Sequence, residues 1–97
     1  MAESSAEITV EHEHGLHLRP AADFVRLAAT FTSAVKVTNL TRGGSREANA
    51  RSLLQVTALG INQGHTIRLE ASGEDAEGAV TALMELIRSN FGTTSGA

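Results

Sequence analysis

The segment Gly15-Leu16-His17-Leu18-Arg19-Pro20-Ala21 holds the side chains whose types and spacing point most directly to chemistry. Pro20 predicts a helix start, because a residue without an N–H is tolerated in the first helical turn. His17 is then expected at, or one residue before, a helix N-terminus, where the N–H groups of Leu18 and Arg19 form an anion site. Such an end disfavours an imidazolium and favours a neutral, nucleophilic imidazole. A phosphoryl group on His17 would meet these donors and the guanidinium of Arg19.

Other interpretations of the histidines compete with this one. His17 can equally be a polar capping residue without chemistry, and local physics alone does not separate the two. His12, His14 and His17 also form a His-x-His-x-x-His pattern, but no distant ligand accompanies it and we expect no metal. We find no Ser-His-acid arrangement that indicates a hydrolase, and His65 is expected to be a solvated surface residue.

Ser52 begins a second segment with a recognisable pattern. Ser52-Leu53-Leu54-Gln55 matches a capping box, in which the serine oxygen accepts from a first-turn N–H and Gln55 reaches back to the serine N–H. The pattern predicts a short helix that runs to about residue 58 and stops at Gly60. The cap alone accounts for a serine at this position.

Composition excludes several classes of protein. The 97 residues suffice for one domain, and the chain has no cysteine, which removes disulfide scaffolds and thiol nucleophiles. A net charge of −3 and three aromatic residues disfavour a nucleic-acid binder. No run of residues is apolar enough to span a membrane, and the first residues do not resemble a secretory signal, so we expect a cytoplasmic protein.

Hydrophobic periodicity predicts seven elements within a core of about residues 7–91, between loose termini. Strands are expected over 8–11, 34–39, 46–50 and 66–71, with a turn over 41–45. Helices are expected over about 20–29 and 52–58 and from residue 76 toward Phe91. The last helix buries a stripe of apolar residues: Ala76, Ala79, Val80, Leu83, Leu86 and Ile87. The order β-α-β-β-α-β-α predicts an α+β, open-faced two-layer sandwich, a four-stranded antiparallel sheet with three helices on one face.

The two motifs together resemble the HPr family, the histidine phosphocarriers of the bacterial phosphotransferase system. The segment from Gly15 to Ala21 is similar to that family's active-site signature. Ser52-Leu53-Leu54 with Leu59-Gly60 is similar to its regulatory serine segment, and the resemblance runs from about Glu7 to Phe91. It implies one HPr-like domain that accepts a phosphoryl group from enzyme I on Nδ1 of His17, with Arg19 stabilising the group. The group then passes to a IIA domain in sugar uptake or regulation.

The resemblance also implies regulation and docking. It makes the chain a monomeric carrier without a cofactor rather than an enzyme. Ser52 is similar to the serine that an HPr kinase/phosphorylase modifies, and a regulatory module acting through Ser52 is the alternative function. The connection from Asn39 to Arg46 is longer than the common family pattern. The residues implied in partner contact are Leu18, Ala22, Leu53 and Leu54, with Arg19, Arg26 and Arg51 as a positive rim on an acidic protein.

Overall fold

A computed structural model describes residues 3–13, 15–16, 18–43 and 46–89. Its elements follow the predicted order, with one short 3₁₀ helix, η1, added after the second strand. In chain order they are β1 (Glu3–Thr9), α1 (Leu18–Ala28), β2 (Ala34–Asn39), η1 (Leu40–Arg42), β3 (Glu47–Asn49), α2 (Leu53–Ala58), β4 (Thr66–Ser72) and α3 (Ala76–Arg88).

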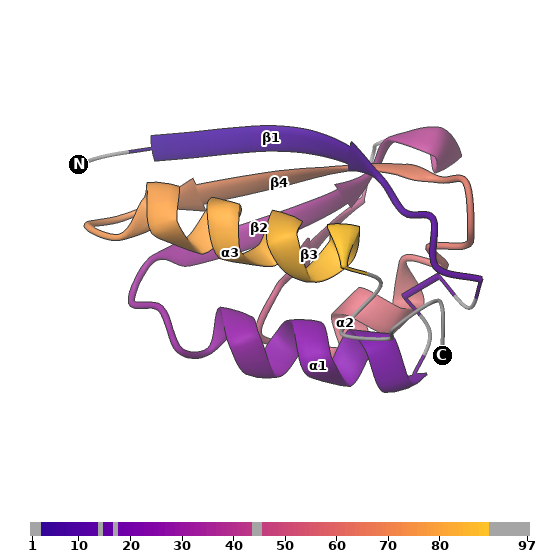
Figure 1. The fold of residues 1–97 in the computed structure, drawn as a ribbon, viewed down its shortest axis with the longest axis horizontal. Coiled ribbons are helices and arrows are strands. Elements are labelled where there is room, and N and C mark those ends of the chain that lie inside the picture. Colours follow the sequence, from indigo (N-terminus) through magenta and orange to yellow (C-terminus); the bar gives the residue numbers. More distant parts are fainter. Residues whose placement is uncertain (1–2, 14, 17, 44–45, 90–97) are drawn as a thin grey trace.

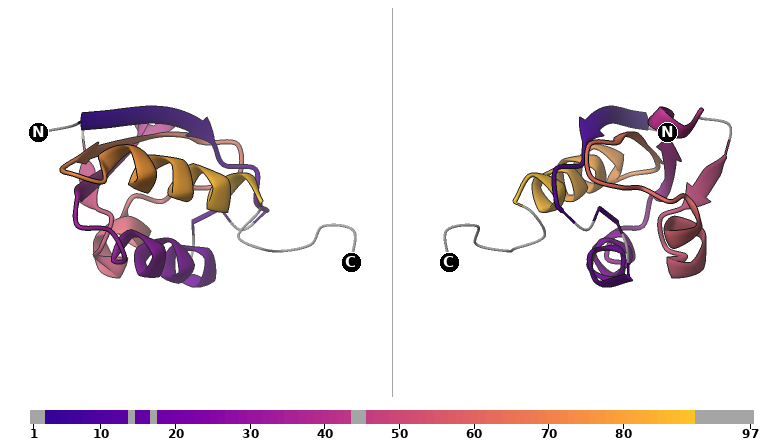
Figure 2. Two further views of the ribbon diagram at one scale, coloured as in Figure 1. Left: turned by 60° about the vertical axis from the view of Figure 1, so that its left-hand side comes forward. Right: turned by 90° about the vertical axis from the view of Figure 1, so that its right-hand side faces the viewer.

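The four strands form one antiparallel sheet in the order β1-β4-β2-β3. The three α-helices lie against one face of this sheet, as Figures 1 and 2 show from three directions. The other face carries polar residues, since the side chains of each strand alternate between core and solvent. The predicted α+β open-faced sandwich is therefore confirmed, and β3 is an edge strand as expected.

β1 begins earlier than the sequence pattern predicts. Residues 3–6 were expected to be loose, yet Glu3 pairs with Ser72 at the far end of β4, and the ladder continues to Thr9 opposite Thr66. Only Ala6 and Ile8 of this strand pack against the core. Residues 3–6 are therefore strand because they pair with β4. A local hydrophobic pattern cannot predict a strand that depends on such pairing.

α1 begins at Leu18, two residues before the expected start at Pro20. Pro20 nevertheless interrupts no hydrogen bond, because the first four N–H groups of a helix have no intrahelical acceptor. Phe24 and Ala28 are fully buried on one side of α1 and Arg26 is exposed on the other. Burial of this apolar stripe holds α1 against α2 and α3.

The core lies between the sheet and the helices. Val37, Ile67 and Leu69 form its sheet side, all fully buried. The expected stripe of α3 is confirmed except that Leu86 is only partly buried, and Phe91 lies outside the described residues. The stripe residues that are buried are Ala76, Ala79, Val80, Leu83 and Ile87.

Asp75 joins the start of α3 to the loop between α1 and β2. Its carboxylate accepts hydrogen bonds from the backbone N–H groups of Thr32 (2.9 Å) and Ser33 (2.8 Å) and a short one from the Ser33 hydroxyl. The bond from the Ser33 hydroxyl and then that from the Thr32 N–H lower the pKa of Asp75 from 3.8 to about 2. The ionised carboxylate is thus the form that the fold prefers.

We expect Asp75→Asn to unfold more easily than the wild type at pH 7 and to lose the acid-sensitive part of the stability curve. A folded pKa below the unfolded one means that stability is complete above about pH 5 and declines as the pH falls toward 2. Urea unfolding at a series of pH values measures this slope, with the exposed neighbour Glu74→Gln as control. If the free energy of unfolding fell equally with pH in wild type and Asp75→Asn, Asp75 would not cause the loss of stability in acid.

Candidate functional site

The loop that leads into α1 is pinned to the segment that follows α2. The Leu16 N–H donates to the carbonyl of Ile61 at 2.9 Å, and the Gly15 N–H donates to the carbonyl of His12 at 2.8 Å. Leu16 itself is buried in the core with 1% of its surface exposed. Position 17 therefore lies between a buried anchor and the first residue of α1, although His17 itself falls outside the described residues.

Gly15 allows this close approach of two backbone segments. Its φ of +57° is in the left-handed region that glycine favours. A Cβ at this position would lie 2.2 Å from the carbonyl oxygen of Ile61 and 2.8 Å from Cα of Asn62. Gly15 is therefore needed for two reasons: its backbone is in the left-handed region, and a side chain there would clash with the backbone of Ile61 and Asn62.

The start of α1 offers two features that suit an anion. Arg19, the second residue of the helix, is exposed. Within the described ranges, no carboxylate lies at ion-pairing distance from its guanidinium. The first-turn N–H groups of an α-helix add a partial positive charge directed along the helix axis. Both features favour an anion near the start of α1.

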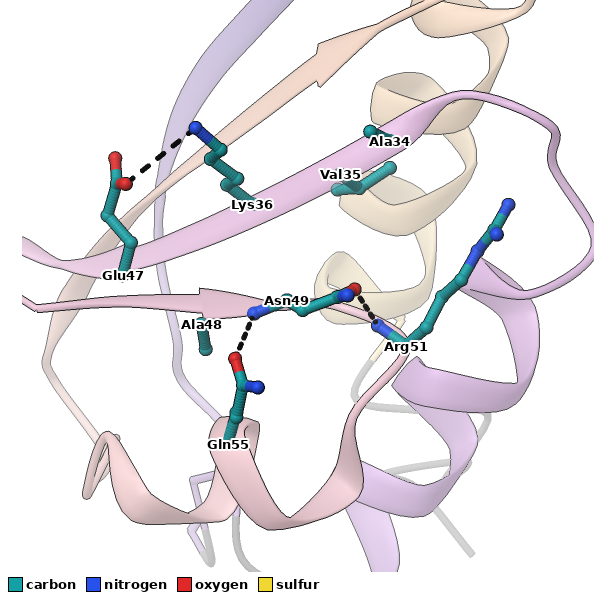
Figure 3. A pocket seen from close by; sticks show the side chains of 8 residues that line it. All are labelled: Ala34, Val35, Lys36, Glu47, Ala48, Asn49, Arg51 and Gln55. Atoms are coloured by element: carbon teal, nitrogen blue, oxygen red, sulfur yellow. Dashed lines mark hydrogen bonds and ion pairs between the residues drawn. The ribbon is translucent and has the colours of Figure 1, made fainter.

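Ser52 is the N-cap of α2, as predicted. Its Oγ accepts a hydrogen bond from the Gln55 N–H at 3.2 Å. The second half of the expected capping box is wrong, because Gln55 Oε1 accepts from the Asn49 N–H at 2.9 Å, while the Ser52 N–H donates to the Asn49 carbonyl. Figure 3 shows Gln55 directed at the backbone of β3. The glutamine thus joins α2 to the edge strand instead of closing the cap.

Replacing Ser52 by alanine should therefore destabilise the protein through the lost cap. We expect Ser52→Ala to lower the free energy of unfolding by about 0.5–2 kcal/mol. Ser52→Asp should retain the wild-type value, because a carboxylate oxygen also caps a helix. Urea unfolding of the three proteins measures the difference, and equal stability of Ser52→Ala and wild type would show that the cap contributes nothing.

The apolar residues expected to contact partners differ in exposure. Leu54 is 81% exposed, whereas Leu53 packs partly against the core and Ala22 is half-buried. The side chain of Leu18 lies outside the described residues. Leu54 is thus the one large apolar side chain among the described residues that is fully available to another molecule.

The three arginines expected to form a rim are not gathered around the start of α1. Arg26 lies in the last turn of the helix and pairs with Asp23 at 3.4 Å. The guanidinium of Arg51 donates to the carbonyl of Phe31, beyond the C-terminal end of α1. In Figure 3 Arg51 extends toward that loop from a groove of about 340 Å³ between β2, β3 and α2. Only Arg19 of the three lies at the helix start.

His65 is a further position at which the sequence expectation fails. It is half-buried rather than solvated, with Nδ1 3.1 Å from both Asn39 Nδ2 and the Asn62 nitrogen. It therefore supports the same segment, 59–65, that anchors Leu16. No sequence pattern indicates the contact with Asn39, since that partner is 26 residues away in the chain.

Two negative findings concern the described residues only. Among them no three His, Asp or Glu side chains come together as a metal site, while His14 and His17 of the alternative metal cluster lie outside them. None of the helices in that part of the chain has the length and apolar character needed to cross a membrane.

This fold, a four-stranded antiparallel sheet with three α-helices on one face, defines a class of small α+β domains. A family model described as "PTS HPr component phosphorylation site" matches residues 4–89, and the chain belongs to the HPr family. It is 39% identical to the phosphocarrier protein HPr of Haemophilus influenzae over 86% of this chain and 93% of that protein. A solved structure, HPr-C-His from Thermoanaerobacter tengcongensis, is 38% identical, with a TM-score of 0.86 over 93% of this chain and 97% of that one.

Longer relatives are also similar. The multiphosphoryl transfer protein of Salmonella typhimurium is 47% identical over 91% of this chain. The chain spans about a quarter of that relative's length, since the match covers 23% of it. The HPr family comprises phosphocarrier proteins, and membership of it supports a phosphocarrier role for this chain.

Proposed function

We propose that His17 accepts a phosphoryl group on Nδ1 from phospho-enzyme I and donates it to a IIA-type domain. The observation that carries this proposal is the start of α1 at the residue directly after His17, next to the exposed guanidinium of Arg19. The carrier role of the family supports it. On this proposal residues 1–97 form one HPr-like domain that acts as a monomer in the cytoplasm.

The transfer needs no group outside the two proteins. The lone pair of Nδ1 on a neutral His17 attacks phosphorus, and the bond from phosphorus to the donor's histidine nitrogen breaks. The leaving imidazole takes up a proton, and the ring of His17 releases the one on Nε2. The first turn of α1 and Arg19 stabilise the charge on the phosphoryl oxygens during the in-line displacement.

A stabilisation by the helix end of up to about 2 kcal/mol suits a carrier. A much larger value would make the phosphohistidine too stable to pass the group onward. The same donors serve both directions of transfer, so the site stabilises the group without trapping it.

Incubation with phosphoenolpyruvate and enzyme I tests the proposal. We expect one acid-labile, base-stable phosphate per chain, located on His17 by mass spectrometry and on Nδ1 by phosphorus NMR. The control is that the same enzyme I phosphorylates another carrier. If it does and this protein, while folded, gains no phosphate, the proposal is contradicted.

Arg19→Ala should slow the transfer strongly and leave the fold intact. Removing one donor that stabilises charge in a transition state commonly lowers the rate about 10²–10³-fold. Because Arg19 is exposed, the midpoint of thermal unfolding should change little. Stopped-flow transfer from phospho-enzyme I measures the rate, and Arg68→Ala on the open face of the sheet is the control. An unchanged rate would remove Arg19 from the mechanism.

The second candidate function is regulation through Ser52. The observation that favours it is the half-exposed serine at the start of α2, where a helix N-terminus tolerates a phosphate. On this reading an HPr kinase/phosphorylase modifies Ser52 and the added charge weakens docking of enzyme I. Ser52→Asp should retain the fold and lower the affinity for enzyme I, and unchanged affinity would argue against the switch.

A further inference from the structure

The peptide unit between Ile61 and Asn62 is hydrogen-bonded at both of its polar groups. Its carbonyl oxygen, on Ile61, accepts from the Leu16 N–H at 2.9 Å. Its N–H, on Asn62, donates to Nδ1 of His65 at 3.1 Å. A trans peptide unit is planar and its C=O and N–H point in opposite directions, so a bond at one group orients the other. The imidazole of His65 therefore helps to direct the carbonyl that holds Leu16.

The hydrogen bonds of His65 determine which ring nitrogen carries the proton. A backbone N–H can only donate, so Nδ1 accepts from Asn62 and the neutral ring is protonated on Nε2. Nδ2 of Asn39 lies 3.1 Å from the same Nδ1. This Nδ2 also donates to the carbonyl of Leu59 at 3.3 Å, which fixes the orientation of the amide. Nδ1 of His65 thus accepts from two donors that belong to separate parts of the chain.

Asn39 is buried at the end of β2 although its amide is only partly satisfied. The residue is 3% exposed, and among the described residues its Oδ1 is a buried atom without a hydrogen-bond partner. An unpaired buried oxygen destabilises a fold, and an apolar side chain at this position would avoid that cost. The two bonds from Nδ2 are therefore the contribution of the amide, and they tie both ends of the segment 59–65 to β2.

This segment also holds the connection between β1 and α1 at a second point. Val10 donates to the carbonyl of His65 at 2.9 Å and accepts from the Gly64 N–H at 2.7 Å. Figure 1 shows the connection from α2 to β4 beside the connection from β1 to α1, at the right-hand end of the molecule. Together with the bond from Leu16, these contacts hold the chain up to the residue that directly precedes His17 in the sequence.

We propose that His65 is a positioning residue for phosphoryl transfer, which acts through the Ile61–Asn62 peptide on the loop that contains residue 17. The inference rests on the proposed function in taking His17 as the phosphoryl acceptor. In-line transfer requires alignment of the attacking nitrogen, the phosphorus and the leaving nitrogen. A displacement of about 1 Å caused by a change far from the reacting atoms can lower a rate about 10²-fold. Without the acceptor on His65, the peptide loses one of the two bonds that orient it.

Two substitutions separate the acceptor on His65 from the volume of its ring. In His65→Leu a methyl group takes the place of Nδ1, whereas in His65→Asn the amide Oδ1 is the same number of bonds from the backbone and accepts as Nδ1 does. We expect His65→Leu to lower the rate constant of transfer from phospho-enzyme I about 10-fold or more. Exchange of the Leu16 amide should become about 2–10-fold faster, the equivalent of one hydrogen bond. His65→Asn should stay close to the wild type in both.

Asp75→Asn is the control for a general loss of stability. Asp75 holds the loop between α1 and β2, at the opposite end of the molecule from the α2–β4 connection in Figure 1. Its substitution should lower the stability without changing the transfer rate or the exchange of Leu16. Rapid-quench transfer is measured at a temperature at which circular dichroism shows every variant to be folded. Nitrogen NMR of the wild type at about pH 8, where an imidazole is neutral, should place the His65 proton on Nε2.

Three outcomes overturn the inference. They are equal transfer rates for His65→Leu and wild type, an equal loss of rate in His65→Asn or Asp75→Asn, and a proton on Nδ1 of His65 in the neutral wild type. The NMR measurement needs no variant, so it decides even if His65→Leu fails to fold. If the wild type itself gained no phosphate, the proposed function would be contradicted. The Leu16 exchange and the NMR would then still show whether His65 orients this peptide.

Discussion

His17→Ala should carry no acid-labile phosphate after incubation with phosphoenolpyruvate and enzyme I, while remaining folded. The expected loss is complete, because residue 17 directly precedes α1, whereas the other imidazoles of this loop, on His12 and His14, are not adjacent to the helix start in the chain. The change before a helix costs at most about 0.5–2 kcal/mol, which a domain of ordinary stability tolerates. Phosphorus NMR and mass spectrometry measure the phosphate, and circular dichroism measures the fold.

A matched variant in the same loop sharpens this result. His12→Ala removes a nearby imidazole, whereas the hydrogen bond from the Gly15 N–H ends on the His12 backbone carbonyl and is retained. We expect His12→Ala to be phosphorylated like the wild type. Phosphate on His17→Ala, or its loss from His12→Ala alone, would show that residue 17 is not the acceptor.

Gly15→Ala should both destabilise the protein and slow phosphoryl transfer. The left-handed backbone costs alanine about 1–2 kcal/mol. In addition its Cβ would lie 2.2 Å from the Ile61 carbonyl oxygen and 2.8 Å from Cα of Asn62, both backbone atoms that cannot rotate away. The loop must move, and the hydrogen bond from Leu16 to Ile61 is then lost or lengthened. Thermal unfolding, the exchange of the Leu16 amide and the transfer rate measure these effects.

Gly64→Ala separates the strain of the backbone from the clash. Gly64 has φ +88°, yet a Cβ there would meet no atom within 4 Å. We expect this variant to show the conformational cost alone and to transfer phosphate at the normal rate. If Gly15→Ala were no less stable than Gly64→Ala, the close approach of Gly15 to Ile61 would have no energetic importance.

Local patterns predicted the parts of the fold that depend on local physics. The alternation in β2 and β4, the Ser52 cap and the buried stripe of α3 each depend on the spacing of residues within a single element. The motif around His17 was likewise evident, because a helix start requires particular residues at fixed spacing. The resemblance to the HPr family added the role of His17, and family membership supports that role.

Tertiary structure decided what depends on residues distant in the chain. Glu3 joins β1 because β4 lies beside it. Gln55 accepts from the Asn49 N–H while the Ser52 N–H donates to the Asn49 carbonyl, and Arg51 donates to a carbonyl beyond α1. Arg42 reaches the turn after α2 because Gly60, at the start of that turn, has no side chain to occupy the space of the guanidinium. Sequence by itself determined which elements form and which residues can do chemistry, since both depend on side-chain type and spacing. Only the packed fold determined which cations lie beside the site, because long side chains take their positions from whatever neighbours the topology provides.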